Sequence, residues 1–135
     1  MIAVDSSIVV AGFASWHEFH SLAVKALDRS PRLIAHAAVE AFSLLTRLPP
    51  PHRAQPQIVH EFITRQFTEP VLTLSETGYQ ELMETVATSG VSGGQTYDAL
   101  IGFTAAGHGA TLLSLDRRAA VTYEAVGATA EQLTV

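Results

Sequence analysis

The N-terminal stretch MIAVDSS, residues 1–7, decides the fold of this chain. Ile2 to Val4 form a short apolar run, which predicts a buried strand that begins almost at the N-terminus. Asp5 follows at the end of that run, and a second apolar run begins at Ile8. In open parallel α/β sheets, ligands bind in the crevice outside the carboxyl ends of the strands. The stretch therefore predicts a parallel sheet with Asp5 at its functional edge.

The composition is typical of a single soluble globular domain. Of the 135 residues, 47% are hydrophobic and 16% are charged, which is enough apolar material for one core in a domain spanning residues 1–135. No apolar run approaches the roughly 20 residues needed to cross a bilayer. We therefore expect no membrane association and a cytoplasmic location. The sequence has no cysteine, which excludes disulfides, zinc–thiolate sites and thiol catalysis.

The net charge of −5 is the wrong sign for a protein covered in basic nucleic-acid-binding surface. It argues against broad, non-specific binding of nucleic acid by the chain alone. It does not exclude a nuclease, because a bound divalent metal ion neutralises a cluster of carboxylates and attracts phosphate.

Apolar periodicity predicts strands and helices that alternate along the chain. Strands are expected at 2–4, 32–35, 71–74 and 110–116, with residues 131–135 as a candidate edge strand. Helices are expected at 8–11, 16–28, 37–48, 56–67, 75–88, 96–106 and 117–123. With right-handed crossovers, this order gives a parallel sheet covered by helices on both faces.

Local signals refine two of these helices. Ser6 or Ser7 is expected to cap the first helix, and Gly12 is expected to end it. In the helix at 96–106, Gly102 and the neighbouring alanines predict tight packing of this helix on the sheet.

Four carboxylates lie at positions that the fold brings towards one rim. Asp5 and Asp116 end predicted strands, Asp98 starts a late helix, and Glu40 is the only carboxylate of a helix that is apolar almost all round. Strand carboxyl ends and helix N-termini share one edge of a parallel α/β sheet, so Asp5, Asp98 and Asp116 can converge there. Taken singly, Asp98 and Asp116 are equally well explained as helix caps.

Several acids held together require a cation, and the only lysine of the chain, Lys25, lies on a predicted exposed helix. Hard oxygen ligands without cysteine favour Mg²⁺ or Mn²⁺. Such a site supports metal-assisted hydrolysis of phosphodiesters, because the metal activates a water and neutralises charge in the transition state.

Residues 4–7 (VDSS), Glu40 in its apolar helix, residues 97–101 (YDALI) and residues 112–119 (LLSLDRRA) form an ordered set. This set resembles the PIN domain and, more narrowly, the VapC-type toxins of type II toxin–antitoxin systems. The resemblance covers the whole chain in length and element order. It implies a three-layer α/β/α fold with a central parallel sheet of about five strands, and a Mg²⁺-dependent endoribonuclease.

The resemblance also implies roles for individual residues. Asp5 and Asp98 would be the principal metal ligands, and Glu40 and Asp116 would complete the acidic pocket directly or through water. Ser7 and Ser114 match hydroxyl positions that would orient carboxylates, waters or a phosphate. Arg117 could contact the RNA backbone, although an ordinary surface arginine explains this residue equally well.

The same resemblance implies partners. These are an RNA substrate, a VapB-like antitoxin whose C-terminal segment would block the metal site, a homodimer, and a toxin–antitoxin hetero-oligomer.

The same residues also bear on three alternative functions. An aspartyl phosphatase requires a second aspartate two positions after the first, where this chain has Ser7, and a supporting lysine downstream of Lys25, where none exists. A phospho-receiver domain lacks the same lysine. A catalytically idle PIN-fold module that binds an antitoxin or RNA without cleavage remains open, although it gives no reason to retain four uncompensated acids.

Overall fold

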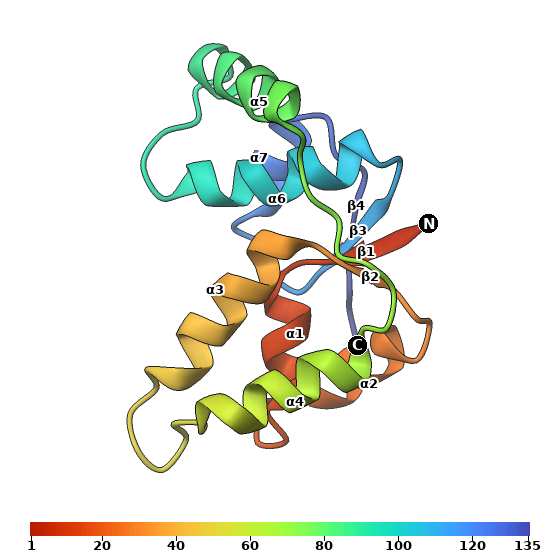
Figure 1. The fold of residues 1–135 in the computed structure, drawn as a ribbon, viewed down its shortest axis with the longest axis vertical. Coiled ribbons are helices and arrows are strands. Elements are labelled where there is room, and N and C mark those ends of the chain that lie inside the picture. The colour runs from red at the N-terminus through yellow and green to blue at the C-terminus, as the bar shows by residue number, and fades with distance from the viewer.

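The computed structural model describes residues 1–135 as four strands and seven helices (Figure 1). None of these helices is both long and apolar enough to cross a membrane. In chain order the elements are β1 (Ile2–Val4), α1 (Ser6–Phe13), α2 (His20–Leu27), β2 (Arg32–Leu33), α3 (Ala35–Thr46), α4 (Pro56–Gln66), α5 (Glu76–Thr88), α6 (Gln95–Gly107), β3 (Thr111–Ser114), α7 (Ala120–Ala125) and β4 (Ala130–Gln132).

The sheet is parallel throughout and has the order β2-β1-β3-β4. The register pairs Ala3 of β1 with Arg32 of β2 on one side and with Leu112 of β3 on the other. The chain winds outwards from β1 in one direction and then, from β3, in the other. The topological switch point therefore lies between β1 and β3, which is where ligands bind in open α/β sheets.

The expectation of about five strands was wrong by one, because the predicted strand at 71–74 is reduced to a single bridge. The amide of Leu72 donates to the carbonyl of Leu33 at 2.8 Å, and the carbonyl of Leu72 accepts from Ala35 at 2.9 Å. Pro70 before it has no amide hydrogen, and Ser75 after it already caps α5. Between these two residues, only Leu72 pairs with the neighbouring segment.

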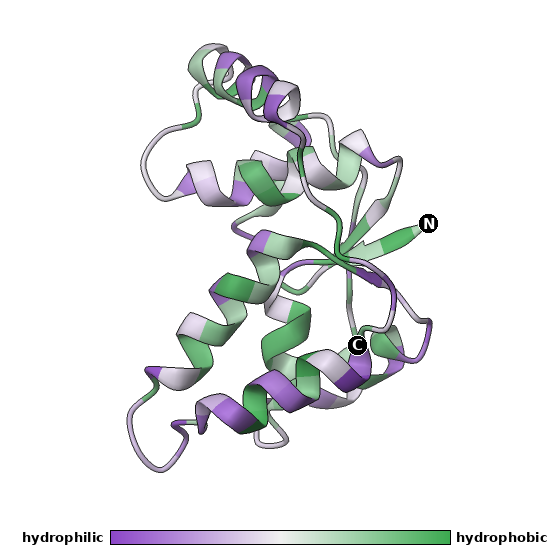
Figure 2. Cartoon of the chain, viewed as in Figure 1, coloured by the Kyte–Doolittle hydropathy of each residue, from purple (hydrophilic) through white to green (hydrophobic).

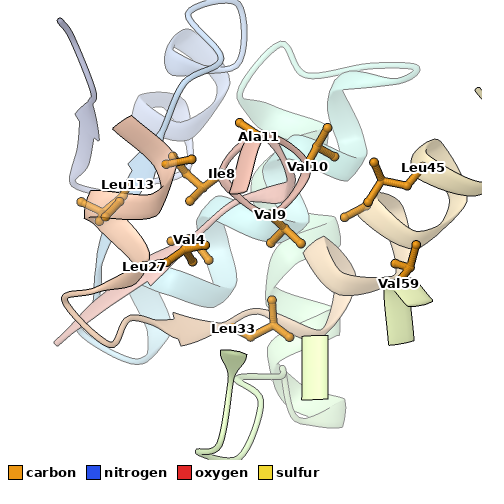
Figure 3. Close-up of a cluster of buried hydrophobic side chains, with 13 residues drawn as sticks. Val4, Ile8, Val9, Val10, Ala11, Leu27, Leu33, Leu45, Val59 and Leu113 are labelled. Atoms are coloured by element: carbon orange, nitrogen blue, oxygen red, sulfur yellow. The ribbon is translucent and has the colours of Figure 1, made fainter. Parts of the chain in front are cut away.

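Helices cover both faces of the sheet, which confirms the three-layer α/β/α prediction. Alternate strand residues point to opposite faces, so Val4 and Leu113 enter one apolar cluster while Ala3 and Leu112 enter another. The first cluster, drawn in Figure 3, joins the sheet to α1, α2, α3 and α4. The second joins it to α6 and α7. Figure 2 shows polar residues on the outward faces of α4 and α5 and apolar residues in the central strands.

The first two helices differ from their predicted limits. Asp5, and not Ser6 or Ser7, caps α1, and Gly12 lies inside this helix, which continues to Phe13. The helix predicted at 16–28 begins only at His20. Before it, the amide of Phe19 donates to the His17 ring nitrogen Nδ1 at 3.0 Å, and this local bond replaces a helical turn.

Gly102 packs closely as predicted, but against α7 and not against the sheet. A Cβ atom at this position would lie 3.0 Å from the Tyr123 ring and 3.0 Å from the Val126 side chain. The missing side chain lets α7 approach α6. This contact places the Tyr123 hydroxyl within hydrogen-bonding distance of Asp5, at the end of β1.

Candidate active site

The acidic residues meet at the carboxyl ends of β1 and β3, on the two sides of the switch point. Asp5 directly follows β1, Ser114 is the last residue of β3, and Asp116 lies two residues further on. The amide of Asp5 donates to the carbonyl of Leu113 at 3.3 Å, so the pairing of the strands continues into the site. The regular sheet thus holds the first acid in place.

Asp5 is buried, with 1% of its surface exposed, and both of its carboxylate oxygens accept hydrogen bonds. Oδ1 accepts from the amide of Ser7 at 3.0 Å, from the Ser7 hydroxyl at 2.5 Å and from the amide of Ile8 at 3.4 Å. Oδ2 accepts from the Ser114 hydroxyl at 2.5 Å and from the Tyr123 hydroxyl at 2.7 Å. Together these bonds tie α1, β3 and α7 to one carboxylate.

The two serine hydroxyls extend this arrangement to the loop after β3. The Ser7 hydroxyl accepts from the amide of Leu115 and the Ser114 hydroxyl accepts from the amide of Asp116, each at 2.9 Å. Each hydroxyl therefore donates to Asp5 and accepts from the loop that carries Asp116, which fixes its orientation. Both hydroxyls thus contact Asp5 itself, and their role in orienting a metal site stays a prediction.

The other three acids surround Asp5 less tightly. Asp116 accepts through Oδ1 from the amides of Arg118 at 3.0 Å and Ala119 at 3.3 Å, as a cap of the turn before α7. Glu40, on α3, accepts from the Ser6 hydroxyl through Oε1. Asp98 lies in the first turn of α6, where the helix dipole favours a negative charge.

The charges of the four acids interact. Loss of hydration on burial, followed by the charges of Glu40, Asp116 and Asp5 in that order, raises the pKa of Asp98 to about 6. No hydrogen bond from the protein opposes this shift. The structure therefore brings together the four carboxylates that the sequence singled out, at a distance where they repel one another.

Burial also raises the pKa of Asp5, against the opposing effect of its hydrogen bonds from Ser114, Ser7, Tyr123 and Ile8. The Tyr123 hydroxyl has its pKa raised by burial and by the charge of Asp5, so it remains a donor at every physiological pH. The buried carboxylate is therefore held by neutral donors only. No basic side chain compensates its charge.

The donor set fits a hydrated hard cation. The ion pairs of the structure are Arg29–Glu131 and His36–Glu40, so no arginine or lysine neutralises Asp5, Asp98 or Asp116. No three acidic or histidine side chains converge closely enough to enclose an ion by themselves. Mg²⁺ needs no such cage, because it keeps several waters and is bound through one or two carboxylates.

Arg117 is exposed and directly follows Asp116. It lines a surface hollow of about 750 Å³ together with Asp116 and the C-terminal residues 133–135. A contact between Arg117 and RNA stays a prediction.

The sequence analysis missed two residues of the site. Tyr123 looked like an ordinary apolar position of the last helix, and no motif distinguishes it. Ser6 was considered only as a cap, although its hydroxyl instead fixes Glu40 of α3. Both act across the fold, so only the tertiary structure identifies them.

Comparisons with known proteins identify the family of this chain. The family model described as "PIN domain" matches residues 2–125. Ribonuclease VapC40 of Mycobacterium tuberculosis is 52% identical over 134 residues, which cover 99% of this chain and 100% of that protein. Ribonuclease VapC27 of the same organism is 36% identical over 127 residues, or 93% and 92% of the two chains.

Among solved structures, FitAcB from Neisseria gonorrhoeae matches with a TM-score of 0.69 over 96% of each chain, at 18% identity. This similarity supports the fold alone.

The Tyr123 hydroxyl can be tested for its part in holding Asp5. Tyr123→Phe removes one of two donors to Oδ2 and keeps the buried ring, so we expect a loss of about 1.5–3 kcal/mol in the free energy of unfolding, as for other hydrogen bonds to charged groups. Urea denaturation measures this loss. The matched control is Tyr79→Phe on α5, where the side chain is 49% exposed and the expected change is below about 0.5 kcal/mol. Equal effects of the two substitutions would contradict the network.

The raised pKa of Asp98 predicts a pH-dependent stability. Below pH 3.8 the carboxyl group is protonated in both states. As the pH rises from 3.8 to about 6, the unfolded chain ionises first and the folded state loses stability. Asp98→Asn lacks this loss, so in EDTA at pH 8 it should be more stable than the wild type by roughly 1–2 kcal/mol after screening by water.

The stability difference between Asp98→Asn and the wild type should shrink towards zero near pH 4, as measured by urea denaturation at each pH. Asp28→Asn, at an exposed position outside the site, serves as the control and should show no such trend. A less stable Asp98→Asn protein at pH 8 would count against repulsion among the four acids.

Proposed function

This chain belongs to the PIN-domain family and, within it, to the VapC ribonucleases, and from that membership we propose a divalent-metal-dependent endoribonuclease that acts as the toxin of a toxin–antitoxin pair. It is a nuclease of the hydrolase class. The observation that carries the proposal is the group of four carboxylates at the switch point of a parallel sheet, without an arginine or lysine partner, where burial and then the charges of Glu40, Asp116 and Asp5 raise the pKa of Asp98. Such a set is costly unless a cation is bound.

We propose that Asp5, Glu40, Asp98 and Asp116 hold Mg²⁺, or Mn²⁺ in its place. When bound, this ion supplies an activated water and neutralises charge on the phosphodiester. Asp98 accepts no hydrogen bond from the protein, and Asp116 uses only Oδ1 towards it, so both have oxygens available to the ion or its waters. Asp5 already accepts five hydrogen bonds, so it would contribute mainly its negative charge, from a buried position.

The remaining residues orient the acids during the reaction. Ser7 and Ser114 hold the Asp5 carboxylate, and Ser6 holds Glu40. Nε2 of His36 lies 3.9 Å from Oε2 of Glu40, one helical turn away on α3. Because these side chains are fixed before substrate binds, little reorganisation accompanies the reaction.

The partner proposals rest on family membership. We propose that a VapB-like antitoxin binds the chain and blocks the acidic site, and that the toxin forms a homodimer that assembles with the antitoxin. Analytical ultracentrifugation of the toxin alone and with its partner measures both states.

Cleavage of RNA tests the proposed activity. The purified protein should cut a pool of single-stranded RNA oligonucleotides in millimolar Mg²⁺ or Mn²⁺ and not in EDTA. Asp98→Asn removes one ligand charge at nearly constant volume, so we expect cleavage to fall by about 100-fold or more. Asp28→Asn should retain wild-type activity, because this exposed residue lies outside the site.

The contrary results for this experiment are specific. Equal cleavage with and without divalent metal, or full activity of Asp98→Asn, would rule out the metal site. A folded wild-type protein that cleaves no RNA with any divalent ion would indicate the idle PIN-fold module.

Growth of bacteria tests the toxin role. Expression of the wild-type chain should stop growth, and expression of Asp98→Asn should not. Co-expression of the protein encoded next to this chain should restore growth with the wild type. If that protein binds the chain and growth still stops, the proposed inhibition is wrong.

A further inference from the structure

A second hollow opens directly from the acidic site and has a different character. It has a volume of about 540 Å³, and Ser7, Glu40 and Asp116 form its inner end. Trp16, His17 and Phe19, from the turn between α1 and α2, form its outer end. We call this hollow the aromatic pocket. Its aromatic side chains have no role in the proposed metal site.

The rings of the aromatic pocket are held in place before any ligand arrives. The Trp16 and His52 rings are stacked with their centroids 4.2 Å apart and tilted by 33°. The His17 ring lies 5.9 Å from the Phe19 ring, and its Nδ1 accepts a hydrogen bond from the Phe19 amide. Trp16 nevertheless keeps 49% of its surface exposed. Trp16 is thus packed against a neighbouring ring and still half exposed, so its indole is available for stacking with a ligand.

The charge of the pocket restricts what it can bind. Glu18, Glu40 and Asp116 line it, and no arginine or lysine does. Glu40 and Asp116 belong to the proposed metal site, so Glu18 is the charged residue in the rest of the lining, where a phosphate group or an acidic peptide finds no basic partner. A flat, uncharged aromatic group fits the rings, and its amino groups find carboxylate acceptors. Nucleobases have this chemistry, and single-stranded RNA is recognised largely by stacking of unpaired bases on aromatic side chains.

We propose that the aromatic pocket binds an unpaired base of single-stranded RNA, next to the phosphodiester that is cut, with Trp16 as the stacking partner. The inference rests on the proposed ribonuclease function, because it places the base beside the acids that act on the neighbouring phosphate. An antitoxin segment that blocks the acidic site would compete with this base, since the pocket shares Ser7, Glu40 and Asp116 with that site.

Fluorescence gives a test that does not depend on cleavage. Trp16 is the single tryptophan of the chain, so its emission reports on the pocket alone. In the Asp98→Asn background, where Asp98 does not line the pocket, a single-stranded RNA hexanucleotide should quench this emission in a saturable way. An abasic hexanucleotide of the same length should quench it little. Equal quenching by both, or none by either, overturns the proposal.

Kinetics give the second test. On an RNA that the wild type cleaves, Trp16→Ala should raise KM by roughly 5- to 100-fold, the range expected for loss of one base–aromatic stack, with kcat changed little. Trp16→Phe should recover most of this loss, because it restores an aromatic face. The matched control is Tyr79→Ala, since Tyr79 is also 49% exposed and should leave KM unchanged.

The outcomes separate the pocket from the enzyme. If the wild type cleaves RNA and Trp16→Ala has the same KM as the wild type, the base pocket is rejected and the ribonuclease proposal stands. A Trp16→Ala protein that loses only inhibition by the antitoxin identifies a protein-binding surface and also rejects it. If the wild type cleaves nothing, the ribonuclease proposal fails, and base-dependent quenching still decides whether the pocket binds RNA. Should Trp16→Ala fail to fold, His52→Ala tests the same stack from behind.

Discussion

The buried carboxylate of Asp5 is the constraint on which the rest of the structure depends. Five hydrogen bonds reach it from α1, β3 and α7, and two of their hydroxyl donors also hold the loop that carries Asp116. These bonds make a buried charge tolerable, and they fix the geometry of the site at the same time. The fold can then present three further acids around a rigid centre. Burial, followed by the charges of Glu40, Asp116 and Asp5, raises the pKa of Asp98, which is the energetic cost expected of the proposed cation site when it is empty.

The sequence predicted the layers of the fold well, because apolar periodicity reports burial directly. Ala3 and Val4 alternate between two clusters, and the parallel sheet follows from the alternation of strands and helices. It predicted the limits of single elements less well, because these depend on competition between neighbouring bonds. Leu72 forms one bridge instead of a strand, and the turn before His20 replaces the first part of a predicted helix.

The candidate site divides in the same way. The four acids were identifiable because each lies at the end of a strand, at the start of a helix or within an apolar helix, where a carboxylate needs a reason. The two serines were identifiable only through the resemblance to the family. Tyr123 and Ser6 were not, because their partners lie 118 and 34 residues away in the sequence. The aromatic pocket could not be predicted from the sequence either, because the contact between Trp16 and His52 forms only in the folded chain. Local patterns thus identify charged ligands, and tertiary contacts identify what positions them.

The four carboxylates are proposed to form a divalent-metal site. The anomalous scattering of Mn²⁺ in crystals of the wild-type protein tests directly whether they bind the ion. An anomalous peak is expected among Asp5, Glu40, Asp98 and Asp116 at millimolar Mn²⁺, and this peak should be absent from crystals of Asp98→Asn. A well-ordered wild-type crystal with no peak at these residues, or with an undiminished peak in Asp98→Asn, would contradict the proposed metal site.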